Sequence, residues 1–242
     1  MKKCACITGG TKGIGRAVAE AMAADGYNLL LTYAADSNAA KRAGMELWQR
    51  FGLEVHVVQA DITSPEAPDK LRTYIREKKL LLDALVFNAG LTARASLNEI
   101  QREEWERVFF ANVHFPVFCL QALLTHLRPG ACVVFTGSRM ADAPHSLSLA
   151  YGVSKAAVHA LVRNLVKFLQ PYGIRVNGVA PGFVDTQWQQ DKPPEIRQSI
   201  ESKIAAGRFC RPQEVADVYR MLILNDYFNG EVITIDGAYS YK

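Results

Sequence analysis

Short apolar runs alternate with longer segments of helical periodicity along the whole chain. The runs expected to form strands lie at residues 4–8, 28–33, 54–59, 83–88, 131–136, 174–179 and 231–235. Nearly continuous apolar strands that alternate with helices are typical of a parallel sheet covered on both faces. The pattern predicts an α/β, Rossmann-type doubly wound fold with about seven parallel strands. No linker or repeat interrupts it, so we expect one domain over residues 1–242.

Helices are expected between these strands. Their predicted ranges are 14–24, 37–50, a start near 65, 103–127, 149–169, and most of 184–229. Pro116 lies inside the range 103–127 and should kink or divide that helix, because proline lacks the backbone N–H.

Composition narrows the classes of function. The 28 Lys and Arg against 24 Asp and Glu give a net charge of +4, too small and dispersed to indicate nucleic-acid binding. No run approaches the roughly 20 apolar residues of a membrane span. Five cysteines show neither zinc spacing nor a disulfide framework, and the start MKKCACITGG lacks a signal-peptide core. We therefore expect a cytoplasmic protein without a metal site.

A glycine-rich stretch, ITGGTKGIG, follows the first strand and runs into a helix. Gly9 permits a sharp turn, Gly13 lets the backbone approach a pyrophosphate, and Gly15 lets the helix pack closely. The N–H groups and dipole at the helix start favour an anion. A P-loop is excluded because Lys12 precedes Gly13 and Ile14 follows it. A purely structural tight turn is the alternative.

Three further residues suggest acid–base chemistry. Ser138 follows the strand 131–136, and Tyr151 and Lys155 lie one turn apart on a predicted helix. An ammonium beside a phenol favours the phenolate and lowers its pKa from about 10. Tyr151 would act as general acid or base, and Ser138 would donate a hydrogen bond to a carbonyl oxygen. Taken singly, these residues are also common on an ordinary helix face or as a helix cap.

Together, these motifs resemble the short-chain dehydrogenase/reductases across nearly the whole chain. The matching pieces, in the family's order and spacing, are TGGTKGIG (8–15), Asp61-Ile62, Asn88-Ala89-Gly90, Asn112, Ser138, Tyr151, Lys155 and Pro181-Gly182.

The resemblance implies a catalytic tetrad and a nucleotide site. The tetrad is Asn112, Ser138, Tyr151 and Lys155. Residues implied to bind the nucleotide are Gly9, Thr11, Lys12, Gly13, Ile14, Gly15, Tyr33, Asp61, Ile62, Asn88, Ala89, Gly90, Tyr151, Lys155, Pro181, Gly182, Val184 and Thr186. In the family, Asn112 would hold a water that links Lys155 to solvent, and residues 186–207 would form a mobile substrate lid. The alternatives are an Asn112 satisfied by backbone, an Asp61 that caps a turn and a solvated Lys12.

The resemblance also bears on the cofactor. NAD-preferring members carry an acidic residue at the end of the second strand, where this chain has Tyr33. Lys12 stands where NADP-preferring members often have a basic residue. Both favour NADP(H), whereas Asp36, three residues later, keeps NAD(H) open.

Overall likeness is to the 3-oxoacyl-(acyl-carrier-protein) reductases. It includes VAPGFVDT (179–186), GRFCRPQEVAD (207–217) and GEVITIDGAY (230–239). It implies an NADPH-dependent ketoreductase acting on a small-molecule carbonyl or alcohol, and a homotetramer. The connection 124–134 is shorter than the family's carrier-docking segment, so docking of a carrier protein is left open. Gly137 replaces a frequent Ser or Ala.

Two alternative functions remain open at this point: an NAD-linked sugar, polyol or steroid-type dehydrogenase, and a nucleotide-sensing binding protein. The place of His145 is open as well, since it would either line a polar pocket or be an exposed loop residue.

Overall fold

Seven parallel strands form one sheet in the computed structural model, which describes residues 2–144, 147–190 and 192–239. The strands are β1 (Cys4–Ile7), β2 (Asn28–Tyr33), β3 (Val55–Gln59), β4 (Leu82–Phe87), β5 (Leu127–Thr136), β6 (Arg175–Pro181) and β7 (Val232–Ile235). They run in the order β3-β2-β1-β4-β5-β6-β7. The predicted doubly wound α/β fold is confirmed. His145 lies outside the described residues.

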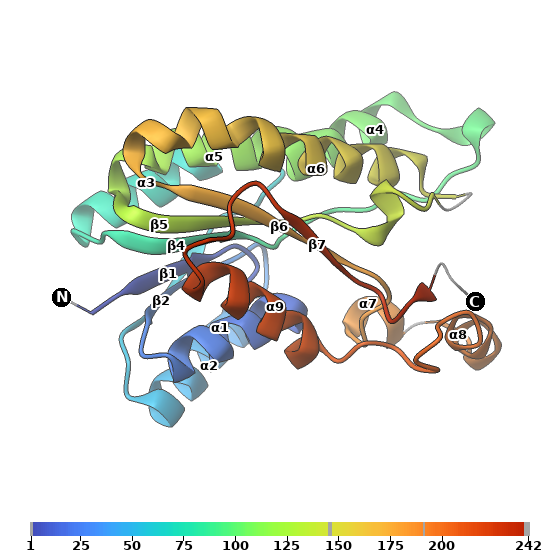
Figure 1. The fold of residues 1–242 in the computed structure, drawn as a ribbon, viewed down its shortest axis with the longest axis horizontal. Coiled ribbons are helices and arrows are strands. Elements are labelled where there is room, and N and C mark those ends of the chain that lie inside the picture. Colours follow the sequence, from blue (N-terminus) through green and yellow to red (C-terminus); the bar gives the residue numbers. More distant parts are fainter. Residues whose placement is uncertain (1, 145–146, 191, 240–242) are drawn as a thin grey trace.

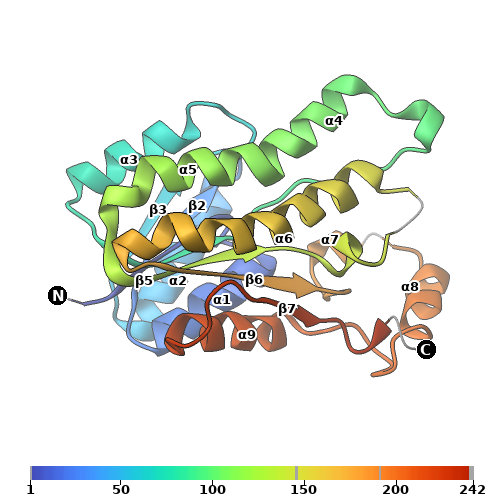
Figure 2. The same cartoon turned by 45° about the horizontal axis from the view of Figure 1, so that its top comes forward.

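Helices cover both faces of this sheet, as Figures 1 and 2 show. Their bounds are α1 (Gly13–Ala24), α2 (Ser37–Phe51), α3 (Ala67–Glu77), α4 (Arg102–Phe109), α5 (Phe115–Leu123), α6 (Leu149–Leu169), α7 (Gln187–Gln190), α8 (Pro194–Glu201) and α9 (Pro212–Leu224). In Figure 1, α3, α4, α5 and α6 lie above the sheet, and α1, α2 and α9 lie below it. Two hydrophobic clusters fill the two layers. Strand order reverses between β1 and β4, which is where ligands bind in such folds.

The predicted helix 103–127 is divided in the structure, as expected from Pro116, but the irregular turn lies before the proline. Helix α4 continues through a wide turn, Phe110–His114, into α5, and the N–H of Phe115 bonds to the carbonyl of Phe110. The distortion thus precedes Pro116, which stands near the start of α5. Pro116 has no N–H for the carbonyl of Asn112, and the wide turn makes room for its ring. Strand β5 also begins at Leu127, earlier than the predicted Ala131.

By length and composition alone, one helical stretch among the described residues, Arg102–His126, could cross a membrane. The prediction that no run is long enough is wrong in that sense. In the fold, however, this stretch packs beside α3 and α6 and contributes Phe115 and Cys119 to the core. It therefore occupies the place of a core helix.

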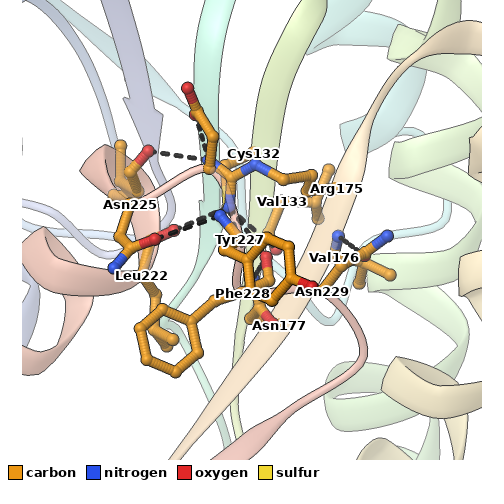
Figure 3. Close-up of polar contacts among 12 residues, drawn as sticks. Cys132, Val133, Arg175, Val176, Asn177, Leu222, Asn225, Tyr227, Phe228 and Asn229 are labelled. Atoms are coloured by element: carbon orange, nitrogen blue, oxygen red, sulfur yellow. Dashed lines mark hydrogen bonds and ion pairs between the residues drawn. The ribbon is translucent and has the colours of Figure 1, made fainter.

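Arg175 ties the last helix to the sheet (Figure 3). From β6, its guanidinium donates to the carbonyls of Leu222 and Phe228, at 2.9 Å each, and to that of Ile223 at 2.9 Å. The C-terminal carbonyls of α9 are thereby satisfied by a cation, which also suits the helix dipole. Asn229 adds to this link, because its Oδ1 accepts the N–H of Val176 at 3.0 Å.

Candidate active site

The glycine loop links β1 to α1 at the carboxyl edge of the sheet. Gly9 and Gly13 have φ of +63° and +56°, which side-chain-bearing residues rarely adopt. At Gly15, an added Cβ would lie 2.4 Å from the carbonyl oxygen of Gly9. Helix α1 therefore packs against the loop at a distance that only glycine allows.

Asn88, after β4, supports this loop. The hydroxyl of Thr8 accepts the N–H groups of Asn88 and Ala89 at 3.0 and 3.1 Å. The Asn88 amide donates to the carbonyl of Thr8 at 2.9 Å. On the other side, the N–H of Gly9 bonds to the hydroxyl of Thr32 at 3.2 Å. The loop is thus fixed by both neighbouring strands, β2 and β4.

The start of α1 suits an anionic group. Lys12, at the N-cap, is exposed and gives the first turn no side-chain hydrogen bond. The first N–H groups of a helix need a partner, and a phosphate is a favourable one. The segment after β6 reaches the same place, because the Thr186 methyl would lie 3.6 Å from a Cβ on Gly13. The residues present therefore fit the pyrophosphate of a dinucleotide.

Ser138, Tyr151 and Lys155 meet at the carboxyl ends of the central strands. Lys155 Nζ lies 5.6 Å from the ring centre of Tyr151 and donates to the carbonyl of Thr136, the last residue of β5, at 2.6 Å. A Cβ on Gly90, after β4, would lie 3.4 Å from the same Nζ. Ser138, two residues beyond β5, forms a hydrogen bond with the Tyr151 phenol. Helix α6 thus brings Tyr151 and Lys155 to the strand ends.

Burial dominates the electrostatics of this group. It lowers the pKa of Lys155 to about 8. It also raises the pKa of Tyr151, and the hydrogen bond from Ser138 works in the opposite direction. The expectation that Lys155 lowers the phenol pKa below its usual value is wrong for the protein's own groups, because Lys155 points its ammonium at Thr136 and desolvation prevails. Tyr151 therefore carries its proton at neutral pH and has one to give.

Asn112 lies in the wide turn between α4 and α5. Its Oδ1 accepts the N–H of Leu91 at 2.8 Å, and its Nδ2 donates to the carbonyl of Leu91 at 2.8 Å and to Ser154 Oγ at 2.9 Å. Ser154 in turn donates to the carbonyl of Tyr151 at 2.8 Å. The amide is thus satisfied mainly by backbone and ties α6 to the segment after β4. The water toward Lys155 remains a prediction.

Residues at the predicted adenosine end have local partners. Asp36 caps α2, because its carboxylate accepts the N–H of Ala39 at 2.8 Å. Asp61 accepts the N–H and the hydroxyl of Thr63 at 2.9 Å each, which is the turn-capping alternative. Tyr33 is the last residue of β2, and Ile62 belongs to the core. The cofactor roles predicted for Thr11, Ile14, Tyr33, Asp61 and Ile62 remain predictions.

The residues predicted at the nicotinamide end follow β6. Pro181 ends that strand, and the N–H of Gly182 bonds to the carbonyl of Ile235 at 2.9 Å. Val184 pairs with Cys210 in an isolated bridge.

The start of the predicted lid is helical rather than a loop. Residues Gln187–Gln190 form α7, and α8 follows; both lie beyond the carboxyl ends of the strands in Figure 1. Trp188 packs edge-on against Tyr151, with ring centroids 6.4 Å apart. Sequence reasoning missed this aromatic partner, because a single Trp in a polar stretch carries no periodic signal.

Two other neighbours of the site were missed. Arg139 pairs with Asp236 at 3.0 Å, joining the segment after β5 to the end of β7. His159 accepts the backbone N–H of Ser138 at 3.4 Å. The only sequence signal for His159 was a polar residue on the apolar face of α6. Among the described residues, no group of three His, Cys, Asp or Glu is placed to hold a metal ion.

Comparison with known proteins gives the family. A profile described as "Enoyl-(Acyl carrier protein) reductase" matches residues 9–240. The chain is 33% identical, over 99% of its length and 99% of the relative's, to the uncharacterized oxidoreductase YmfI of Bacillus subtilis. This chain belongs to the short-chain dehydrogenase/reductase family. As a member of it, the protein is an NAD(P)-dependent oxidoreductase.

Two further comparisons, one with a curated relative and one with a solved structure, place this short-chain dehydrogenase/reductase among proteins of described activity or ligand. The chain is 31% identical to the 3-oxoacyl-[acyl-carrier-protein] reductase FabG of Aquifex aeolicus, covering 98% of this chain and 96% of FabG. Its fold superimposes on a short-chain dehydrogenase of Burkholderia cenocepacia solved in complex with NADP. That match has a TM-score of 0.91 and 30% identity and covers 98% of each chain. A nicotinamide cofactor follows from these relationships.

Proposed function

We propose that this oxidoreductase is an NADPH-dependent ketoreductase for substrates of the 3-oxoacyl type. The observation that carries the proposal is the convergence of Ser138, Tyr151 and Lys155 at the strand ends beside the glycine loop. The three groups supply a hydrogen-bond donor, a proton and a cation within one site, which is what reduction of a carbonyl requires.

Ser138, Tyr151 and Lys155 would each have a separate task in the reaction. When bound, a reduced nicotinamide supplies the hydride that reaches the carbonyl carbon. Ser138 Oγ accepts the N–H of Met140 at 3.1 Å, and its one hydroxyl hydrogen, which bonds to the Tyr151 phenol in this structure, would turn to the carbonyl oxygen of a bound substrate. Tyr151 gives its phenol proton to that oxygen as charge develops. Lys155, by its position near Gly90, would hold the nicotinamide ribose.

The residue at the end of β2 supports a preference for NADPH over NADH. Tyr33 ends this strand, where a carboxylate would repel a 2′-phosphate. Asp36 is occupied as the cap of α2. Lys12 is exposed at the start of α1 and is able to pair with a phosphate. The NADP complex of the Burkholderia relative supports the same choice.

The proposed substrate class is supported by the position of Trp188 beside Tyr151 and by the similarity to FabG. Trp188 is 56% exposed and stacks edge-on against Tyr151, so it offers an apolar surface beside the reacting carbonyl. Such a surface is available to the apolar part of a substrate, such as an acyl chain. The similarity to FabG points to a 3-oxoacyl group, delivered either by a carrier protein or as a free thioester.

Assembly as a cytoplasmic homotetramer is part of the proposal. Phe118 on α5 and Phe168 on α6 are 53% and 71% exposed, and Val153 on α6 is exposed too. Apolar surface of this kind on two adjacent helices favours contact with another copy of the chain. Light scattering after gel filtration gives the mass in solution, and a monomer would contradict this part.

One assay tests the proposed function. Purified protein is given a 3-oxoacyl thioester, free or on a carrier protein, with NADPH or NADH. We expect oxidation of NADPH, with the free thioester accepted and NADPH bound at least about tenfold more tightly than NADH, near 1.4 kcal/mol. A preference for NADH, with turnover of sugars, polyols or steroids, would favour the NAD-linked alternative. Nucleotide binding without turnover of any carbonyl would favour a nucleotide sensor.

A further inference from the structure

The imidazole of His159 is buried behind the backbone of Ser138. His159 stands on α6, four residues after Lys155, so the two side chains share one face of the helix. The residue is 5% exposed. Its Nε2 accepts the backbone N–H of Ser138 at 3.4 Å, a long hydrogen bond. A side chain outside the proposed catalytic group therefore contacts the peptide that carries the reactive hydroxyl.

Gly137 is the residue that makes room for this ring. An added Cβ would lie 2.3 Å from Nε2 and 2.6 Å from Cδ2 of His159. The backbone at Gly137 is fixed, since its N–H bonds to the carbonyl of Val179 at 2.7 Å. A side chain at position 137 and the imidazole at 159 thus exclude each other. The buried imidazole of His159 therefore explains why this chain has glycine where the family often has Ser or Ala.

The contacts also fix the protonation of the ring. Because the N–H of Ser138 donates to Nε2, that nitrogen carries no hydrogen, and the neutral ring holds its hydrogen on Nδ1. Nδ1 lies 3.6 Å from the carboxylate of Asp142.

Other charged groups face the ring as well. Burial lowers the pKa of His159, Asp142 acts in the opposite direction, and Arg163 and Lys155 on α6 add to the lowering. Arg139, which pairs with Asp236, lies 4.0 Å from Asp142 on the same segment after β5. The ring is therefore neutral at pH 7.

We infer that His159 is a positioning residue: its neutral imidazole holds the Ser138 peptide so that the hydroxyl faces Tyr151 and the substrate carbonyl. The inference rests on the proposed reductase function. Protonation of Nε2 removes the lone pair that accepts the Ser138 N–H. Acid therefore releases the Ser138 peptide and lowers the rate of the reaction without displacing the cofactor.

The first test compares two variants of the full chain. His159→Leu keeps the bulk and loses the acceptor, whereas the side-chain carbonyl of His159→Gln replaces Nε2. With a 3-oxoacyl thioester and NADPH, we expect His159→Leu to lose kcat by about tenfold, with KM and the NADPH Kd changed by less than about twofold. His159→Gln should restore most of kcat, and its kcat should lack the fall that the wild type shows on acidification below about pH 6.5. Equal kcat in His159→Leu and wild type would overturn the inference, as would a Gln variant no better than Leu.

The second test needs no turnover. In ¹⁵N-histidine spectra of the wild type, with His159→Gln identifying the signal, we expect the ring with hydrogen on Nδ1. In a thermal unfolding cycle, Gly137→Ala should lower Tm in the wild type and much less in a His159→Ala background. Hydrogen on Nε2, or equal losses in both backgrounds, would contradict the contact. If the wild type turns over no carbonyl, the proposed function fails, and these two measurements still decide whether the contact exists.

Discussion

The ammonium of Lys155 lies 5.6 Å from the ring centre of Tyr151, one helical turn away, and donates to the carbonyl of Thr136 at 2.6 Å. The lysine is thus held by the strand end rather than by the phenol. The amine is therefore already oriented, and in the proposed reaction the phenol would give its proton to the carbonyl oxygen.

Lys155 should make stability depend on alkaline pH. Burial lowers its pKa to about 8 from the usual 10.5, so between these pH values the unfolded chain binds more protons than the folded one. The free energy of unfolding should therefore rise with pH over this range, by up to roughly 3 kcal/mol from this group. Urea denaturation of wild type and Lys155→Met measures the difference. The exposed Lys167 of the same helix provides the control Lys167→Met, and a Lys155→Met curve parallel to wild type would contradict the prediction.

Gly15→Ala should damage the nucleotide site and the fold together. Alanine normally stabilises a helix relative to glycine by about 1 kcal/mol, yet here its Cβ would meet the carbonyl of Gly9 at 2.4 Å. We expect a net loss of about 2 kcal/mol and weaker NADPH binding. Gly26→Ala is the control, because its φ is +84° but its Cβ meets open space, so it should cost about 1 kcal/mol and leave binding intact. Equal NADPH affinities in the two variants would refute this view.

Tyr33→Asp should shift the cofactor preference. A carboxylate at the end of β2 would repel the 2′-phosphate and accept ribose hydroxyls, so the NADPH Kd should rise by about tenfold or more while NADH improves. Fluorescence titrations at one fixed salt concentration give both constants. Asp36→Asn is the control: asparagine also caps helices well, so the preference should stay unchanged. If Asp36→Asn changed the preference between NADPH and NADH, then Asp36 rather than the end of β2 would contact the adenosine ribose.

Lys12→Gln should weaken NADPH binding without affecting NADH. An exposed lysine that pairs with a phosphate contributes about 1 kcal/mol, roughly fivefold in Kd, and salt screens it. The titration is repeated at low and high salt. Equal loss for both nucleotides would place Lys12 at the shared pyrophosphate, and no loss would make it a solvated residue.

Much of the fold could be predicted from the sequence, because strands buried on both faces leave apolar runs. The helix that contains Pro116 shows the limit, since its division was predicted but the place of the irregularity was not. Proline predicts a break in a helix but not where the chain absorbs it, and here the wide turn Phe110–His114 does so. The start of β5 at Leu127 was not predicted, because the sequence Arg128-Pro129-Gly130 is typical of a turn rather than a strand.

The candidate site was predicted less completely than the fold. Ser138, Tyr151 and Lys155 were found by type and spacing, but the balance of burial against charge at Tyr151 depends on side chains brought together only by the fold. Asn112 has the expected position, while its amide partners at Leu91 and Ser154 come from other segments. The exclusion between Gly137 and His159 joins residues 22 apart and appears only in three dimensions.

Tyr151→Phe tests the central claim most directly, since it removes one oxygen and leaves the ring against Trp188. With a 3-oxoacyl thioester at saturation, NADPH oxidation should fall by about a thousandfold, while the NADPH Kd from a fluorescence titration stays within about twofold of wild type. A variant that binds NADPH normally and still oxidises it at the wild-type rate would show that Tyr151 does not transfer the proton.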